Sequence, residues 1–306
     1  MTGRRIALIT DDPGWHGARL ESAFDARGYE TRIVSLADCS LDINGTQHRI
    51  NLPGFGTGSP DGVFVRGIPG GTLEELIFRL NILHALKAQG VTVYNDARAI
   101  ERSVDKVLTS FLVAGAGLSV PPTRVTGTVE DAKTFVQREL AAGYLVICKP
   151  MFGAQGEGIV RIGAMDDLPP QDRVHGVWYL QRFIQSERNG SSDWRVFVIR
   201  NHVVATMRRS TSDGWLTNVA QGGQCHVGVL ESRAAAMAEA AVACLGMSYA
   251  GVDMLCDLQG RWWVLEVNSI PAWRGLQKTT GIDIAGLLAD DFLRECGGAC
   301  LGELAS

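Results

Sequence analysis

The stretch Gly251-Val-Asp-Met-Leu255, followed by Arg261-Trp-Trp-Val-Leu-Glu-Val-Asn-Ser-Ile-Pro271, decides how the rest of the chain is interpreted. Both runs are strand-like, and Gln259-Gly260 between them predicts a turn, so the two runs form a hairpin. Because side chains alternate between the two faces of a strand, Glu266 and Asn268 are expected on the same face.

Three oxygen-bearing side chains then converge on one side of this hairpin. Asp253 lies in the first run, and Glu266 and Asn268 lie in the second. Two carboxylates and one amide form a hard-oxygen site of the kind that Mg²⁺ uses when it holds nucleotide phosphates. The alternative for a lone Glu-x-Asn pattern is a strand edge with solvated polar residues, and the rest of the chain favours the metal site. The side chains expected to point the other way, into the core, are those of Trp263, Leu265 and Val267.

Length and composition limit the classes of protein to which the chain can belong. Its 306 residues are 46% hydrophobic and 20% charged, which predicts about two domains with a large core. A net charge of −4 gives no electrostatic case for binding nucleic acid or an anionic membrane. Seven scattered cysteines favour a reducing cytosol over a disulfide framework. No apolar run approaches the ~20 residues of a membrane span, so a cytoplasmic enzyme or binding protein is expected.

The N-terminal third predicts a parallel sheet with helices on its faces. Ligand sites usually lie where the carboxyl ends of such strands meet. Arg66 stands at one of these ends and is a candidate contact for a substrate carboxylate or phosphate, with a surface salt bridge as the alternative. The stretch 41–59 contains four glycines and is expected to be a mobile cover or a disordered insertion. The strands are expected at 6–10, 31–36, 61–66 and 91–94, and the helices at 17–27 and 74–89.

The middle of the chain combines a helical segment with a glycine-rich loop. Residues 95–117 carry a helical pattern, in which Ser103 is a candidate N-cap and Asp105 lies in the first turn. A strand at 144–149 ends at Lys149 and leads into Met151-Phe-Gly-Ala-Gln-Gly-Glu-Gly158. Glycine lets backbone N–H groups approach phosphate oxygens closely. The loop is not a Walker A motif, because neither Gly-Lys-Ser/Thr nor a helix follows it, and the alternative is an ordinary mobile hairpin.

The ordered set of motifs resembles the ATP-grasp superfamily and, more narrowly, the RimK-type ligases, which add glutamate to a carboxylate-bearing acceptor. The resemblance covers about residues 95–295. Gln181-Arg182 departs from the family's pattern, because many relatives carry a carboxylate there. The motifs are Asp105-Lys106, Lys149 before the glycine loop, Gln181-Arg-Phe-Ile184, Asp193-Trp-Arg195, Asn218 with Gly222-Gly223, Gly251-Val-Asp253, Glu266-Val-Asn268, and the segment from Leu276 to Ala285.

The resemblance implies an α/β (α+β) fold of the ATP-grasp type. A Rossmann-like pre-ATP-grasp domain with a parallel sheet would occupy residues 1–97. Two α+β lobes would clamp ATP, a central lobe at 98–184 and a C-terminal lobe with the metal site at 185–306.

The resemblance also implies a role for each matching residue. Lys106 and Lys149 would contact the ATP phosphates, under a loop that contains Gly153, Gln155, Gly156 and Gly158. Adenine would be bound through the backbone of the segment that contains Gln181, Phe183 and Ile184, and Asp193 would lie near the ribose or orient Arg195. Mg²⁺, as two ions or replaced by Mn²⁺, would be held by Asp253, Glu266 and Asn268. The transferring phosphoryl group and the acceptor would be neutralised by Arg195, Arg208 and Arg209, and Asn218 would contact substrate. Arg66 lies outside the resemblance, and its expected substrate contact rests on its place at a strand end.

The implied reaction is ATP-dependent, ADP-forming ligation of a carboxylate to an amine through an acyl phosphate. Phosphoryl transfer needs positioning and charge neutralisation rather than a protein nucleophile. The expected substrates are glutamate and a small carboxylate-bearing acceptor of the one-carbon-carrier pterin type, and a homodimer or homotetramer is expected. Three alternatives are an ATP-grasp ligase for another amino acid, a ligase for a protein acceptor, and a catalytically silent ATP-binding regulator. A nicotinamide-dependent enzyme is disfavoured, because no G-x-G-x-x-G follows the first strand.

Overall fold

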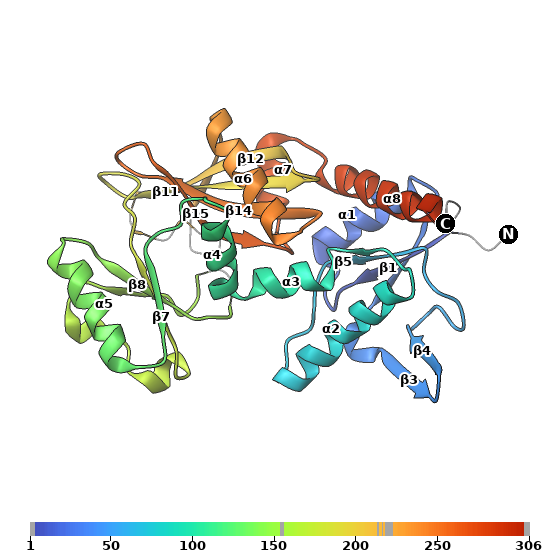
Figure 1. The fold of residues 1–306 in the computed structure, drawn as a ribbon. Coiled ribbons are helices and arrows are strands. Elements are labelled where there is room, and N and C mark those ends of the chain that lie inside the picture. The colour runs from blue at the N-terminus through green and yellow to red at the C-terminus, as the bar shows by residue number, and fades with distance from the viewer. Residues whose placement is uncertain (1–3, 154–155, 213, 216, 218–222, 303–306) are drawn as a thin grey trace. The chain divides into compact units, whose positions relative to one another are not determined.

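The computed structural model describes residues 4–153, 156–212, 214–215, 217 and 223–302, and the side chains of these residues up to Gly297. The chain forms two compact units (Figure 1). Unit 1 comprises Met1–Glu101, Met247–Ala250 and Ser269–Ser306, and unit 2 comprises Arg102–Gly246 and Gly251–Asn268. The expected division of the second part into lobes at residue 184 stays a prediction.

Unit 1 is built on a parallel sheet of strand order β2-β1-β5-β6, as the alternation of strands and helices predicts. Helix α2 begins with a capping box, in which Thr72 Oγ1 accepts from the backbone N–H of Glu75 and the Glu75 carboxylate accepts from Thr72 N–H. The bounds are β1 Arg5–Ile9, α1 Gly14–Asp25, β2 Glu30–Val34, η1 Leu36–Asp38, β5 Gly62–Val65, α2 Leu73–Ala88, β6 Val93–Tyr94, α3 Ala97–Val104, α7 Arg274–Thr280 and α8 Ile284–Gly302.

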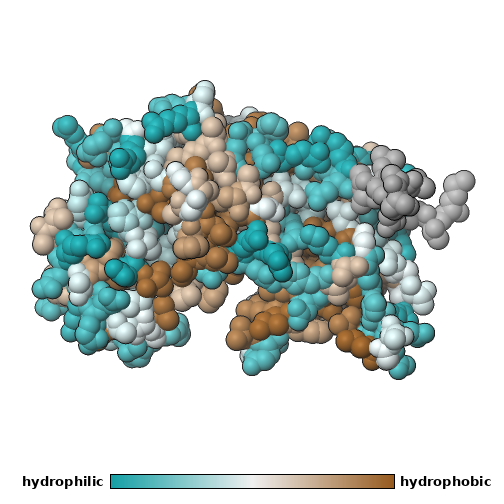
Figure 2. Space-filling view, viewed as in Figure 1, coloured by the Kyte–Doolittle hydropathy of each residue, from teal (hydrophilic) through white to brown (hydrophobic). Residues whose placement is uncertain are grey.

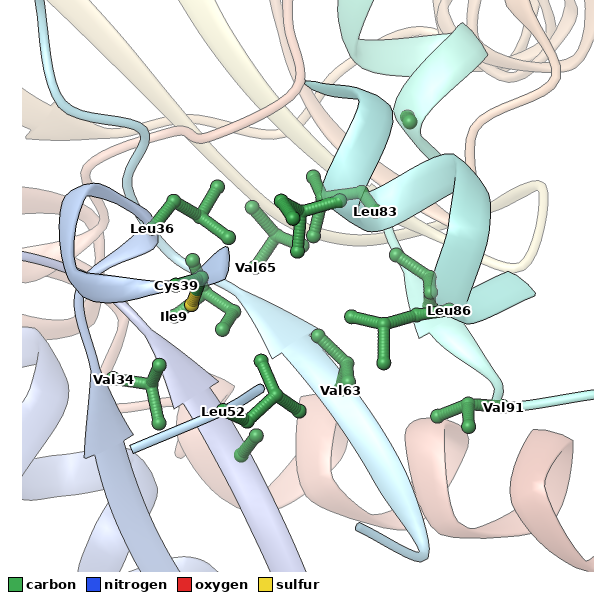
Figure 3. Close-up of a cluster of buried hydrophobic side chains, with 14 of the residues drawn as sticks. Ile9, Val34, Leu36, Cys39, Leu52, Val63, Val65, Leu83, Leu86 and Val91 are labelled. Carbon is green, nitrogen blue, oxygen red and sulfur yellow. The ribbon is translucent and has the colours of Figure 1, made fainter. Parts of the chain in front are cut away.

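The two faces of this sheet are covered by different helices, because alternate residues of each strand point in opposite directions. On one face, Ile9, Val63 and Val65 pack toward Leu83 and Leu86 of α2 (Figure 3). On the other face, aromatic rings pack between β5, α1 and α8 with centroids 5.3–5.9 Å apart. Both faces of the sheet are therefore covered by apolar side chains, as is typical of a parallel sheet. These rings belong to Phe24, Phe64, Tyr94 and Phe292.

Of the two expectations for residues 41–59, the disordered insertion is wrong, and the mobile cover stays a prediction. Most of the first half of this stretch pairs as an antiparallel hairpin of β3, Ser40–Asn44, and β4, Gln47–Asn51. Gly45 has a φ of 60° in the two-residue turn, a conformation that glycine adopts at no steric cost. The partly buried side chains of Leu41 and Ile50 pack on the core between the sheet and α2, which anchors the hairpin.

Unit 2 contains two antiparallel sheets. The sheet of order β7-β10-β8-β9 is covered by α5, and Phe135 and Val136 of this helix pack against Val146 and Leu180. The second sheet has the order β13-β12-β11-β14-β15. The bounds are α4 Lys106–Gly115, β7 Thr123–Thr126, α5 Val129–Ala141, β8 Val146–Lys149, β9 Val160–Ile162, η2 Met165–Asp167, η3 Gln171–Val174, β10 Trp178–Arg182, β11 Ser191–Ile199, β12 His202–Thr211, β13 Gln224–Val227, α6 Ser232–Leu245, β14 Tyr249–Cys256 and β15 Trp262–Asn268.

The helical pattern of residues 95–117 is split into two helices, α3 and α4, rather than forming one. Asp105 has an extended backbone, with a φ of −83° and a ψ of 102°, and interrupts the helix. Its carboxylate accepts hydrogen bonds from the backbone N–H groups of Val107 and Leu108, at 2.8 and 3.1 Å. Asp105, and not Ser103, is therefore the residue that begins α4. This cap places Lys106 in the first turn of the helix.

The surface of unit 1 carries an apolar face on α2 (Figure 2). Leu73, Ile77 and Phe78 have exposed fractions of 69%, 49% and 41%. Single exposed apolar side chains are common on proteins, whereas a group of them is typical of an interaction surface. The oligomeric state stays a prediction. None of the helices described by the structure has the length and apolar character that a membrane crossing needs.

Replacing Asp105 by alanine is expected to destabilise α4, because two backbone N–H groups lose their acceptor. The free energy of unfolding should fall by about 1 kcal/mol, measured by urea denaturation. Thr128→Ala is the matched control, because Thr128 is the N-cap of α5 but its side chain makes no capping hydrogen bond. Equal losses for the two variants would contradict the capping role of Asp105.

Candidate active site

A cleft in unit 2 collects polar side chains from both of its sheets. Its cavity volume is about 120 Å³, and it opens to solvent. Apolar and charged side chains both line it. Nine of the residues that the sequence nominates lie on its walls: Lys149, Gly156, Gln181, Phe183, Ile184, Asp193, Arg209, Asp253 and Glu266.

Two lysines are held in place by neutral oxygens rather than by carboxylates. Lys149 Nζ donates to Gln181 Oε1 at 2.8 Å, and Gln181 Nε2 donates in turn to Thr123 Oγ1 at 2.9 Å. Lys106 Nζ donates to the carbonyl oxygen of Gly153 at 2.8 Å, which ties the start of α4 to the glycine loop. Both ammonium groups therefore keep a charge that an anion can still neutralise.

Burial lowers the pKa of Lys149 to about 8, although the nearby carboxylates of Glu266 and Asp253 oppose this effect and Lys106 adds to it. Desolvation disfavours the charged form of a lysine, so the pKa falls when no direct counter-ion compensates. At pH 7 the side chain is charged. A buried ammonium of this kind is well suited to attract a phosphate group.

The glycine loop has the backbone freedom that the sequence predicts. Gly153, Gly156 and Gly158 have φ values of 131°, 77° and 70°, which residues with a Cβ rarely adopt. Gly156 lies on the cleft, whereas Gly158 lines a separate groove beside Pro150 and Met151. Only part of the loop therefore faces the cleft. Gln155 lies outside the described residues.

Four charged side chains form a ladder of ion pairs, and three of them, Asp193, Arg209 and Asp253, are buried and line the cleft. Arg195 donates to both oxygens of Asp253, at 2.5 and 2.9 Å, and Arg209 donates to both oxygens of Asp193, at 2.7 and 2.6 Å. Arg209 also lies 3.1 Å from Asp253, so it bridges the two acids. Burial would raise the pKa of Asp253, but Arg195 and Arg209 outweigh it and lower that pKa. Asp253 is therefore a fixed carboxylate with arginines on two sides.

Glu266 is a carboxylate of the cleft that no cation of the described residues contacts directly. It lies opposite Asp253 in the pairing of β14 with β15, and no salt bridge or hydrogen bond joins its side chain to another residue in the described part of the chain. Burial and the charge of Asp253 raise its pKa, while Lys106 and Lys149 oppose this shift. Asn268 lies two residues further along the strand, opposite Gly251. The chemistry of this wall suits a cation with oxygen ligands.

The expectation that Leu265 points into the core is wrong. The register of β14 and β15 shifts between Asp253 and Met254, which pair with Glu266 and Val264, so Leu265 is the extra residue of a β-bulge. The bulge interrupts the alternation of faces. Leu265 consequently lines the cleft next to Glu266.

Sequence reasoning missed the apolar walls of the cleft. Ile147 could have been found, because it lies two residues before Lys149 on the same face of β8. Leu255 stands in the same relation to Asp253. Trp215 contacts Phe183 edge-to-face with centroids 6.0 Å apart, a contact between distant segments that no local pattern signals. The missed residues on the walls include Ile147, Ile159, Trp215, Thr217, Leu255 and Leu265.

The backbone of the segment after β10 is partly occupied. Phe183 N–H donates to Leu145 O at 2.9 Å, and Arg182 N–H donates to Pro122 O at 2.8 Å. No hydrogen bond from Ile184 N–H is present in the part of the chain that the structure describes. A ligand that lies against this segment can therefore use Ile184 N–H and the carbonyl oxygen of Phe183.

The sequence nominates three further residues, Arg208, Arg66 and Asn218. Arg208 is paired with Glu187 and donates to Ser192 Oγ, so its charge is compensated outside the ladder. Arg66 belongs to unit 1. Asn218 lies outside the described residues.

Comparisons with known proteins identify the fold. A solved structure of the ATP-grasp ligase PsnB with its minimal precursor, Mg and ADP matches with a TM-score of 0.73 and 20% identity, over 95% of this chain and 98% of that chain. The fold is therefore an ATP-grasp fold with an N-terminal parallel sheet, and the expected fold class is confirmed.

Sequence comparisons identify the family. The models of the RimK PreATP-grasp domain and of the RimK-like ATP-grasp domain match residues 5–100 and 103–292. The tetrahydromethanopterin:alpha-L-glutamate ligase of Methanocaldococcus jannaschii is 34% identical over 229 residues, 72% of this chain and 76% of that protein. A probable alpha-L-glutamate ligase of Alkalilimnicola ehrlichii is 32% identical over 88% of both chains. The chain belongs to the RimK-like ATP-grasp family of carboxylate–amine ligases, and the expected resemblance is confirmed.

Nucleotide binding should weaken as Lys149 loses its proton. A lysine whose pKa is lowered to about 8 carries its charge below that pH and loses it above. If only the charged form attracts phosphate, the Kd for ADP should rise roughly tenfold between pH 7 and pH 9. Calorimetry without divalent cations measures this change. Lys149→Arg stays charged at both values and should show no such rise. A constant Kd for the unchanged protein would contradict the role of Lys149.

Removing Arg209 should strongly destabilise unit 2, because two buried carboxylates would lose their shared cation. For Arg209→Met the free energy of unfolding should fall by about 3–5 kcal/mol. The neighbouring Arg208→Met is the control. Its ion pair is substantially exposed, so the loss should stay below about 1 kcal/mol. Urea denaturation compares the two variants, and similar losses would argue against the ladder as a structural element.

Proposed function

We propose that this ligase joins the amino group of glutamate to a carboxylate-bearing small molecule, through an acyl phosphate and with release of ADP. The observation that carries the proposal is the combination of Glu266 and Lys149 in one cleft. Among the described residues, the Glu266 carboxylate has no hydrogen-bond or ion-pair partner, and the Lys149 ammonium donates to the neutral Gln181. The first suits a cation and the second suits phosphate. The names of the relatives support glutamate as the added amino acid.

ATP would occupy the cleft with its base between apolar walls. Ile147, Leu255 and Leu265 offer flat apolar contact, and Ile184 N–H is available for a ring nitrogen. Lys149 and Lys106 would reach the phosphates. Because Lys106 already donates to Gly153 O, the same contact would draw the glycine loop over the nucleotide. Gly156 would provide a backbone N–H to a phosphate oxygen.

Mg²⁺ fits the acidic wall of the cleft. Among the described residues no three His, Cys, Asp or Glu side chains form a metal cluster, so Glu266 and Asp253 would be completed by the amide oxygen of Asn268 and by phosphate oxygens. Asp253 keeps lone pairs beyond those used by the arginines. The ion, when bound, would neutralise charge on the phosphates. Two ions are proposed, with Mn²⁺ as a substitute.

The reaction would proceed in two transfers. A carboxylate oxygen of the acceptor attacks the γ-phosphorus of ATP, the bond to the β-γ bridging oxygen breaks, and ADP leaves. The amine of glutamate then attacks the acyl carbon, loses a proton and expels inorganic phosphate as the amide forms. Arg195 and Arg209 would stabilise the charge on the transferring group, while Asp253 and Asp193 fix their orientation. Asp193 would in this way act as a positioning residue.

The acceptor is proposed to be a small molecule of the pterin type. This choice is supported by the name of the Methanocaldococcus jannaschii relative, which acts on tetrahydromethanopterin. The net charge of −4 gives no attraction to a nucleic-acid-associated acceptor. Arg66 and Asn218 are proposed as substrate contacts.

Glu266→Gln should abolish ADP formation while the protein stays folded. The carboxamide removes the negative charge that a cation needs but keeps the size of the side chain. The loss of turnover should exceed about 100-fold. The assay combines ADP release with mass spectrometry of a cofactor-rich extract incubated with ATP, Mg²⁺ and glutamate.

The control for this experiment is Glu130→Gln, at an exposed position in the first turn of α5. It should turn over like the unchanged protein. Full activity of Glu266→Gln would remove the metal-site proposal. ADP release without a glutamylated product would keep the ligase chemistry and exclude glutamate as the amine.

A further inference from the structure

Unit 1 contains a pocket of about 360 Å³ that is lined by cations and by no acid. We call it the basic pocket and define it by Trp15 and Arg19 of α1, Arg274, Gln277 and Lys278 of α7, and Gly281 after α7. Helices α1 and α7 come from opposite ends of the sequence, so the fold of unit 1 brings these cations together.

The three cations of the basic pocket have no carboxylate partner among the residues that the structure describes. No salt bridge joins Arg19, Arg274 or Lys278 to an acid in the part of the chain that the structure describes. The guanidinium groups of Arg19 and Arg274 instead lie 5.5 and 5.9 Å from the ring centroid of Trp15. Converging like charges repel one another and create a positive potential, which an anionic ligand relieves.

Arg66 extends this positive charge into the interior of unit 1. Its guanidinium lies 5.1 Å from the ring centroid of Trp273, and its Nη1 donates to Ile270 O at 3.4 Å. Its Nε is buried and has no hydrogen-bond partner among the described residues. Burial lowers the pKa of Arg66 from its ordinary high value, but a guanidinium stays charged. A buried donor without a partner is typical of a site that a ligand completes.

His16 connects Arg66 to the basic pocket without adding charge. Its Nε2 accepts a hydrogen bond from the backbone N–H of Trp273 at 3.1 Å, and the two rings meet edge-to-face at 4.6 Å. Burial, Arg66 and Arg274 together lower the pKa of His16 to about 4, so the imidazole is neutral at pH 7. The positive potential therefore comes from permanently charged side chains.

Gln277 supplies the complementary acceptor. Its Oε1 is buried at the wall of the basic pocket and receives no hydrogen bond from a described residue. A ligand that carries both carboxylates and an N–H donor matches three cations and one amide oxygen. Glutamate and a glutamyl chain have this combination of groups. The segment that bears Arg274 also follows Asn268, a proposed metal ligand, by six residues in the sequence.

We propose that the basic pocket binds the carboxylates of a glutamyl group, a step that rests on the ligase function proposed above. The glutamyl group can be free glutamate or the carboxylate-bearing tail of the acceptor. Both present the same chemistry to Arg19, Arg274 and Lys278, and separate binding experiments distinguish them. Arg66 would add its positive charge to that of the pocket from the interior of unit 1.

Calorimetry with L-glutamate and with an α-linked triglutamate peptide tests this assignment in the full-length protein. Arg274→Gln and Lys278→Gln should each raise the Kd of the bound probe by about 10- to 100-fold. The Kd for ADP should not change. An effect on glutamate alone identifies the donor site, and an effect on triglutamate alone identifies the site of the acceptor tail. Unchanged Kd values for both probes in both variants would overturn the proposal.

Arg98→Gln is the matched control, because Arg98 is an exposed arginine of unit 1 outside the basic pocket. It should bind both probes like the unchanged protein. ADP release and amide formation are measured on the same preparations. If Arg274→Gln ligates with unaltered KM values, the proposal for the basic pocket is overturned and the proposed ligase function stands. If probe binding depends on Arg274 but no ligation is observed, the proposal for the basic pocket stands and the proposed ligase function is refuted.

Discussion

The ion pairs around Asp253 are the constraint on which the candidate site depends. A buried carboxylate is stable only when cations or hydrogen-bond donors surround it, and here Arg195 and Arg209 approach it from two neighbouring strands. The same contacts fix the orientation of both guanidinium groups, because a bidentate pair leaves little rotational freedom. Asp193 holds the far side of Arg209. The ladder therefore orders strands β11, β12 and β14 and aligns the charges that face the cleft.

Against this balanced ladder, Glu266 and Lys149 stand out because neither has a direct counter-ion among the described residues. Each is partly buried, and desolvation moves each pKa toward the neutral form. Such groups lower stability unless a ligand restores the balance. A cation near Glu266 and a phosphate near Lys149 would do so together, which is the charge pattern of a metal–nucleotide complex. In the proposed function, the two halves of one ligand would therefore neutralise these two groups.

Local patterns in the sequence predict the parallel sheet of unit 1 and the shared cleft positions of Asp253 and Glu266, because both follow from the alternation of side chains along strands. Other features depend on contacts that no local pattern encodes. The helical periodicity of 95–117 continues through Asp105, and only the extended backbone at that residue separates the two helices. The β3–β4 hairpin is largely exposed, and the glycines of residues 41–59 favour an interpretation as disorder. The pairing of Arg195 with Asp253 joins residues 58 positions apart, beyond the reach of any spacing rule.

The bulge at Leu265 has a consequence for how chain length can vary in this strand. In a regular strand, the loss of one residue turns every following side chain to the opposite face. Leu265 is the unpaired extra residue between Val264 and Glu266, so its deletion would convert the bulge into a regular ladder and leave Glu266 opposite Asp253. The length of the apolar wall at Leu265 can thus change without moving the carboxylates of the acidic wall, Asp253 and Glu266. Descendants of this chain could reshape the apolar surface next to a bound base by insertion or deletion at this position, without disturbing the carboxylates beside it.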